Sequence, residues 1–109
     1  MRFDDYQKKS RETAIYPKIT RGFIYPTMGL AGETGEFLNK IKKIFRDDKG
    51  RLTIQKKKEL SEELGGVLWY LAQVATELDL SLKDIAKDNL KILASRKKRG
   101  VLNGSGDRR

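Results

Sequence analysis

The amino-acid sequence predicts an all-α protein of four to five helices, whose core is completed by a second copy of the chain. Apolar residues recur at three- and four-residue spacing through most of the chain, as in one-sided helices. No stretch has the alternating pattern of a β-strand. The 109 residues are 36% charged and only 38% hydrophobic, so a core shared between subunits would help such a small, polar chain to bury apolar surface.

The first half of the chain contains two predicted helices. Residues 3–15 form the first, which stops before Pro17 because the residue before a proline leaves the α region. Residues 17–26 contain Gly22 and a second proline and read as a loop. The second helix covers residues 27–45, and residues 47–50 (Asp-Asp-Lys-Gly) form a turn. The apolar stripe of the second helix consists of Leu30, Phe37, Leu38, Ile41, Ile44 and Phe45.

Two further helices are predicted in the second half. The third covers residues 53–78 with Thr53 as its N-cap, and the fourth covers residues 82–98. Ser81 precedes the fourth helix and Asp84 follows three residues later, which resembles a capping box. Residues 100–109 hold three glycines and no periodicity, so we expect a flexible tail. The length predicts a single domain over residues 1–109.

The composition limits the chemistry that the protein can perform. The chain has no cysteine and no histidine, which excludes disulfides, Cys/His zinc sites and histidine-based triads. A metal would need oxygen ligands, which favours Mg²⁺ or Mn²⁺. No apolar run approaches the roughly 20 residues of a membrane span, and the first ten residues lack a signal peptide's apolar region, so we expect a cytoplasmic protein. The net charge of +9 serves solubility or attracts nucleotides or nucleic acid.

Acidic residues lie at matching places on the second and third helices. At roughly 100° per residue, Glu33 falls about 60° from Leu30, at the edge of the apolar stripe, and Glu36 lies one step further on the same side. On the third helix Glu63 has the place of Glu33, and Gly66 has the place of Glu36. If the two helices pack side by side, the three carboxylates face one cleft.

Two interpretations of these carboxylates remain open from spacing alone. Three carboxylates in one pocket repel one another and raise each other's pKa, and a divalent cation relieves both penalties. Alternatively, the acids pair with surface bases such as Lys43 or Lys40, and Glu36 and Lys40 have the spacing of such a pair.

Glycines accompany the acids on both helices. A glycine inside a helix costs about 1 kcal/mol relative to alanine, so several at matched places need a reason. We expect a close approach of a helix backbone or a ligand at these positions. The glycines are Gly32, Gly35, Gly65 and Gly66.

The same residues carry a resemblance to a known family. The segments GLAGETGEFLNKIKK, EELGGVLWYLAQVATELDLSL and NLKILASRKKRGVLNGSGD resemble the MazG-like nucleotide pyrophosphohydrolases, and the opening YQKKSRETAIYP extends the likeness over nearly the whole chain. The resemblance implies an all-α MazG-like bundle that works as a homodimer or homotetramer. It also implies Mg²⁺-dependent cleavage of nucleoside triphosphates between the α and β phosphates, which gives monophosphate and pyrophosphate, and a role in nucleotide metabolism.

The resemblance also implies roles for individual acids. The family holds Mg²⁺ with an E-x-x-E pair, which Glu33 and Glu36 match, and an E-x-x-D pair, of which Glu63 matches the first member. The second member is missing, because this chain reads EELGG where the family pattern is EELGD, and Gly66 replaces the aspartate. A metal-activated water would attack the α-phosphorus, with Glu36 or Glu63 as its proton acceptor.

Nucleotide contacts are expected from the third and fourth helices. The family places an asparagine and a lysine near the nucleotide with the spacing of Asn89 and Lys91, and Arg96 with the basic residues after it would assist. Positive charge at this end of the helix also favours the helix itself, whatever it binds. Tyr70 lies near the Glu63 edge and is expected to contact a base, whereas Trp69 is expected at a subunit interface.

Three functions follow, in order of preference. The first is a Mg²⁺-dependent nucleotide pyrophosphohydrolase, with Mn²⁺ as a substitute metal. The second is a nucleotide-binding protein on the same fold, catalytically impaired by Gly66. The third is a basic helical nucleic-acid binder, ranked last because no helix-turn-helix or aromatic stacking pattern supports it.

Overall fold

The computed structural model describes residues 1–109 and contains four α-helices, one short 3₁₀ helix and no strand, which confirms the predicted all-α class. The α-helices are α1 (Phe3–Ser10), α2 (Ile24–Asp48), α3 (Ile54–Glu77) and α4 (Leu82–Lys98), and the 3₁₀ helix η1 (Arg11–Thr13) follows α1. None of these helices is both long enough and apolar enough to cross a membrane.

Three helix boundaries differ from the sequence prediction. The first α-helix ends at Ser10 and continues only as η1, so the prediction of helix to residue 15 was wrong. Helix α2 begins at Ile24 and therefore includes Pro26, which we had placed in a loop. A proline is tolerated in the first helical turn because the backbone N–H that it lacks has no partner within the helix there. At its other end α2 continues to Asp48, beyond the predicted residue 45, and Lys49 follows in the left-handed conformation (φ 55°).

The predicted helix starts of α3 and α4 are confirmed in atomic detail. The Thr53 hydroxyl accepts a hydrogen bond from the Lys56 backbone N–H at 3.2 Å. The Ser81 hydroxyl accepts one from the Asp84 backbone N–H, also at 3.2 Å. Each cap satisfies one of the N–H groups that have no partner within the helix, which typically contributes about 1 kcal/mol.

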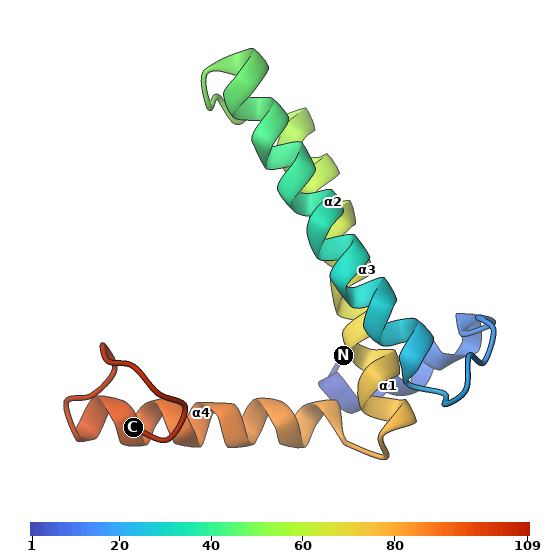
Figure 1. The fold of residues 1–109 in the computed structure, drawn as a ribbon, viewed down its shortest axis with the longest axis vertical. Coiled ribbons are helices and arrows are strands. Elements are labelled where there is room, and N and C mark those ends of the chain that lie inside the picture. The colour runs from blue at the N-terminus through green and yellow to red at the C-terminus, as the bar shows by residue number, and fades with distance from the viewer.

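The helices form two arms that meet at a common base (Figure 1). Helices α2 and α3 lie side by side as a long hairpin, and α4 runs away from the base as the second arm. Helix α1 lies at the base and packs against α3 and α4. The radius of gyration is 16.9 Å, compared with about 13 Å for a compact domain of this length. Only 8 of the 109 residues are buried, so one copy of the chain has a very small core.

Polar side chains organise the base of the molecule. Gln73 is fully buried and donates to the Ser10 hydroxyl at 2.9 Å. The Trp69 indole N–H donates to the Ser10 carbonyl at 3.2 Å and to the Thr13 hydroxyl at 2.9 Å. The Trp69 ring also meets Tyr16 edge-on, with ring centroids 6.2 Å apart. Trp69 therefore packs against residues of its own chain at the base, and its place at a subunit interface stays a prediction.

The start of α4 is held by α1. The side-chain oxygen of Gln7 accepts a hydrogen bond from the Leu82 backbone N–H at 2.7 Å, and its NH₂ group donates to the Leu80 carbonyl at 2.8 Å. Leu82 is itself buried. The rest of α4 leaves large apolar side chains in solvent, with Leu90 67% and Ile92 50% exposed. This exposed apolar surface belongs to the part of α4 that lies beyond its contacts with α1.

Candidate metal and nucleotide site

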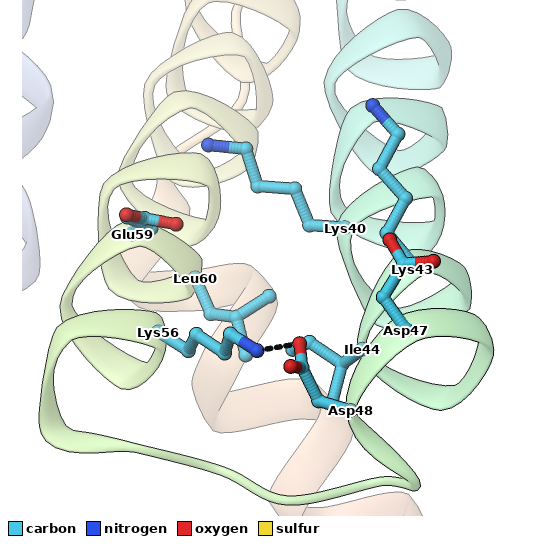
Figure 2. A pocket seen from close by; sticks show the side chains of 8 residues that line it. All are labelled: Lys40, Lys43, Ile44, Asp47, Asp48, Lys56, Glu59 and Leu60. Carbon is cyan, nitrogen blue, oxygen red and sulfur yellow. Dashed lines mark hydrogen bonds and ion pairs between the residues drawn. The ribbon is translucent and has the colours of Figure 1, made fainter.

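The groove between α2 and α3 brings acidic and basic side chains together from both helices. The Lys40 ammonium on α2 pairs with the Glu63 carboxylate on α3 at 3.0 Å. Nearer the tip of the hairpin, Ile44 and Leu60 are buried, 5% and 8% exposed respectively. A pocket of about 210 Å³ opens there, and Lys40 is part of its wall (Figure 2). The other residues that line this pocket are Lys43, Ile44, Asp47, Asp48, Lys56, Glu59 and Leu60.

Glu33 lies directly against α3. A Cβ atom added at Gly66 would lie 2.8 Å from one carboxylate oxygen of Glu33 and 3.0 Å from its carboxyl carbon. The Glu33 carboxylate thus fills the space that any side chain at position 66 would enter. Burial raises the pKa of Glu33, and a hydrogen bond to Glu63 and the charges of Glu63 and Glu36 raise it further.

Glu63 lies between Glu33 and Lys40. The Lys40 ammonium lowers the pKa of Glu63, and a hydrogen bond between Glu63 and Glu33 makes a smaller contribution in the same direction. The same ion pair raises the pKa of Lys40. The pKa values of the two acids are therefore shifted in opposite directions, so Glu33 takes up a proton more readily than Glu63.

Glu36 occupies a different position from the other two acids. Its side chain is exposed and makes no hydrogen bond or ion pair, although its charge reaches Glu33. The structure has no group of three or more acidic side chains placed to hold a metal ion. It thus brings Glu33 and Glu63 together and leaves Glu36 at the open edge of the groove.

Three of the four glycines at which we expected a close neighbour have open space around them. A Cβ at Gly32, Gly35 or Gly65 would meet nothing within 4 Å, so within this chain close packing does not explain these three. Of the four glycines only Gly66 has a close neighbour, the Glu33 carboxylate, and a further close approach is at Gly29, where a Cβ would lie 2.2 Å from the ring of Tyr70. Gly29 therefore lets the Tyr70 ring lie flat against α2.

Tyr70 lies at the base end of the same groove. Its ring meets Trp69 edge-on, with centroids 5.0 Å apart. Burial raises the pKa of Tyr70, and the nearby Tyr25 and Glu33 raise it further. Tyr70 is thus close to the paired acids, as expected, but it is half-buried in contacts of this chain.

The predicted nucleotide-binding residues of α4 lie on the other arm. Asn89 and Lys91 are exposed, and Arg96 is half-buried and donates to the Asp107 carbonyl at 2.7 Å. Figure 1 shows that α4 extends away from the hairpin that carries Glu33 and Glu63. One copy of the chain therefore does not bring the α4 residues to the acids.

Comparison with known proteins identifies the family. The model of the MazG nucleotide pyrophosphohydrolase domain matches residues 26–101, a span that holds every candidate residue named above from Glu33 to Arg96. This chain belongs to the MazG family. It is 48% identical to the gene 37 protein of Mycobacterium phage L5 over 114 aligned residues, which cover the whole of both chains. No solved structure matches the chain.

The ion pair of Lys40 belongs to the second interpretation of the acids in this MazG-family chain, in which they pair with surface bases, but its partner is not the one that spacing suggested. The four-residue spacing suggested a pair with Glu36 on the same helix, whereas the structure pairs Lys40 with Glu63 across the groove. The pair of Lys40 with Glu63 could have been predicted from the order of residues on the two helices. Antiparallel packing that places Glu33 against Gly66 also brings Lys40 near the helical turn that contains Glu63.

Proposed function

We propose that this MazG-family protein is a Mg²⁺-dependent nucleoside triphosphate pyrophosphohydrolase, which converts a nucleoside triphosphate to monophosphate and pyrophosphate. The observation that carries the proposal is the carboxyl pair of Glu33 and Glu63 on facing helices, close enough for each to shift the pKa of the other. Like charges at this distance are costly without a cation or a proton between them. Family membership supplies the reaction class.

The donor set suits a hard cation. Glu33 and Glu63 offer carboxylate oxygens from opposite walls of the groove, and Glu36 offers a third from its edge. These three residues would hold Mg²⁺ once the exposed Glu36 side chain turned toward the other two, since a chain without histidine or cysteine has oxygen ligands alone for this purpose. When bound, Mg²⁺ would neutralise phosphate charge and lower the pKa of a water molecule.

Two acids were candidates for the proton acceptor, and the structure favours Glu36. Glu63 is ion-paired with Lys40, which lowers its pKa and makes it a weaker base. Glu36 has no partner within the chain, so its carboxylate is free to accept a proton from an attacking water. Glu63 would then serve as a metal ligand that its ion pair with Lys40 keeps in place.

A second copy of the chain would complete the nucleotide site. Asn89, Lys91 and Arg96 lie on an arm away from the acids, and Leu90 and Ile92 beside them are largely exposed. In a homodimer or homotetramer, α4 of one subunit would cover apolar surface on the hairpin of another and bring its polar residues to the bound nucleotide. Tyr70 would contact the base from the hairpin side.

This arrangement predicts complementation between two inactive variants. Glu63→Gln impairs the hairpin of its own subunit, and Asn89→Ala/Lys91→Ala impairs only α4. When the two proteins are unfolded together and refolded as a mixture, hybrid dimers should regain one intact site, which is about a quarter of wild-type activity per mole of sites at random pairing. A mixture no more active than its components would show that each site is built by one chain.

The reaction itself is tested with a panel of ribo- and deoxyribonucleoside triphosphates, assayed for pyrophosphate release with Mg²⁺ and with Mn²⁺. We expect release of pyrophosphate, not of single phosphates, and its loss when EDTA removes the metal. A protein that releases pyrophosphate from no member of the panel is not this enzyme.

The second candidate function is nucleotide binding without turnover. Gly66 favours it, because the position that would supply a fourth carboxylate in this family instead accommodates the Glu33 side chain. Calorimetry that shows nucleotide binding by a protein inert in the panel would support this function over hydrolysis.

A further inference from the structure

Charge is separated along the α2–α3 hairpin. The tip, residues 40–58, comprises the end of α2, the connecting loop and the start of α3, and it contains nine basic and two acidic residues, a net charge of +7. Residues 59–81, which continue along α3 to the start of α4, contain five acidic residues and no basic one. The hairpin therefore has a positive tip and a negative stretch below it. Figure 1 shows that the tip projects away from the rest of the molecule.

Most of the positive charge at the tip has no acidic partner within the chain. The two acids of the tip are already paired, one with Arg46 and the other with Lys56. Lys40 pairs with Glu63 across the groove. The exposed basic residues of the tip that take part in no ion pair are Lys42, Lys43, Lys49, Arg51, Lys57 and Lys58. They come from both helices and the loop, so the tip as a whole is cationic.

The lysines of α3 lie where a helix disfavours them. The first turn of α3 contains no acidic residue, and Lys56, Lys57 and Lys58 are among its first five residues. Because the N-terminal end of a helix carries partial positive charge, basic side chains there lower the stability of the helix. The same end of a helix attracts anions, and the lysines add to this attraction. An external anion therefore explains a placement that the helix itself does not favour.

The extent of the basic surface indicates a polyanion in preference to a small anion. At 1.5 Å per residue, the basic side chains extend about 9 Å along α2, from the loop back to Lys42. Double-stranded DNA carries one negative charge per about 1.7 Å of its length, so several cations spread over such a surface can each meet a phosphate. The acids of residues 59–81 repel the same backbone, which favours contact through the tip alone.

An anionic membrane is the competing partner, because Phe45, Leu52 and Ile54 are exposed near the tip. Stable binding in a membrane interface needs a continuous apolar face beside the basic one. Here only Leu52 lies in the loop, and Phe45 and Ile54 lie on different helices. Charge therefore has to carry the binding, and the phosphate backbone of nucleic acid can be bound through charge alone.

Among nucleic acids, the tip fits a DNA duplex best. Single strands are commonly bound by aromatic side chains that stack on the bases, and RNA duplexes by polar contacts to 2′-hydroxyls. The one aromatic ring of the tip, Phe45, lies close to Gly50. Its two uncharged polar side chains, Thr53 and Gln55, are already hydrogen-bonded within α3. Backbone contact with duplex DNA needs neither kind of group, nor the helix-turn-helix that this sequence lacks.

We propose that the tip of the α2–α3 hairpin binds the phosphate backbone of double-stranded DNA without reading its sequence. The surface needs no metal ion and no turnover, so it is independent of the proposed hydrolysis. A protein bound to DNA through this tip would keep the groove with Glu33 and Glu63 free for a nucleotide.

The first test is the fluorescence anisotropy of a labelled short DNA duplex of random sequence, titrated with the full chain in EDTA. Lys57→Gln/Lys58→Gln should weaken binding about tenfold or more and reduce the slope of log K against log salt by about two. The matched control, Lys97→Gln/Lys98→Gln, removes two exposed lysines from the end of α4 and should weaken binding by less than about threefold. Equal losses in the two variants would overturn the proposal, because binding would then follow net charge alone.

Crosslinking locates the contact directly, because the chain has no cysteine of its own. Leu52→Cys places a thiol in the loop of the tip, and Leu80→Cys places one at the base, between α3 and α4. The two leucines are 50% and 49% exposed, and neither substitution changes the charge. With a photoreactive benzophenone on the thiol, the Leu52→Cys protein should crosslink to the duplex several-fold more than the Leu80→Cys protein. Equal crosslinking would contradict a contact through the tip.

Other partners would give different results at the same salt concentration. Tighter binding to vesicles of phosphatidylserine and phosphatidylcholine would overturn the proposal in favour of a membrane, and tighter binding to an RNA duplex would overturn it in favour of RNA. Self-association at low salt that Lys57→Gln/Lys58→Gln abolishes, without DNA binding, would assign the tip to the acids of another copy. DNA binding by a protein that hydrolyses no nucleotide would support the tip and contradict the hydrolase, and the reverse result would do the opposite.

Discussion

Glu63→Gln should lower kcat/KM for nucleoside triphosphate hydrolysis by about 10²- to 10⁴-fold, the range typical of a lost catalytic carboxylate. Glutamine has the same shape but no negative charge, so it attracts neither Lys40 nor a divalent cation. Because Lys40 pairs with Glu63 at 3.0 Å across the groove, the substitution also frees an ammonium group beside the remaining acids. That cation would pair with Glu33 and oppose metal binding further.

The neighbouring Glu62 provides the matched control. It is exposed and makes no ion pair or hydrogen bond, and Glu62→Gln removes the same charge from the same turn of α3. We expect activity within about twofold of wild type, because exposed charges contribute little. Circular dichroism and thermal unfolding establish that both variants fold. If both lose activity equally, the effect is one of overall charge, and Glu63 has no special place in the reaction.

Much of this fold could be predicted from the sequence because each helix has its own local signals. The caps at Thr53 and Ser81 depend only on residues a few positions apart, and the structure confirms them. The apolar stripes predicted the helices themselves, but stripe residues such as Leu38 and Phe45 are largely exposed in the single chain. The boundaries that were wrong depend on context. Pro26 lies in a helix because it falls in the first turn, and a proline in the sequence does not reveal whether it starts a helix or ends one.

The candidate site was only partly predictable for the same reason. Helical geometry placed Glu33 and Glu63 at matching edges, and a hairpin of two long helices is enough to bring them together. Helical geometry alone did not show that Lys40 reaches Glu63 or that Tyr70 packs on Gly29. Both contacts depend on the register between the two helices. The direction of α4 depends on contacts at the base, such as those of Gln7. These contacts cannot be predicted from the spacing of apolar residues within α4.

Gly66→Asp should raise the affinity for Mn²⁺ and Mg²⁺ about tenfold to a hundredfold, because it adds a carboxylate that faces Glu33 across the groove and lies three residues from Glu63 on the same helix. The new Cβ would lie 2.8 Å from a Glu33 carboxylate oxygen, so the Glu33 side chain must move. That movement is inexpensive because the clash involves the end of a flexible side chain. Without metal, the added like charge should lower the thermal stability, and saturating Mn²⁺ should restore it by mass action. Mn²⁺ affinity is measured from the electron paramagnetic resonance signal of the free ion.

Gly65→Asp is the control that separates the effect of an added metal ligand from the effect of an added charge and a changed helix propensity. Position 65 precedes 66 on the same helix, and a Cβ there meets nothing within 4 Å, so the substitution makes the same change in charge and helix propensity in open space. We expect its Mn²⁺ affinity to match wild type. If turnover rises only in Gly66→Asp, the missing acid limits catalysis in the natural chain. If Mn²⁺ affinity is the same in both variants, position 66 is not directed at a metal, and the space over it exists to accommodate Glu33 alone.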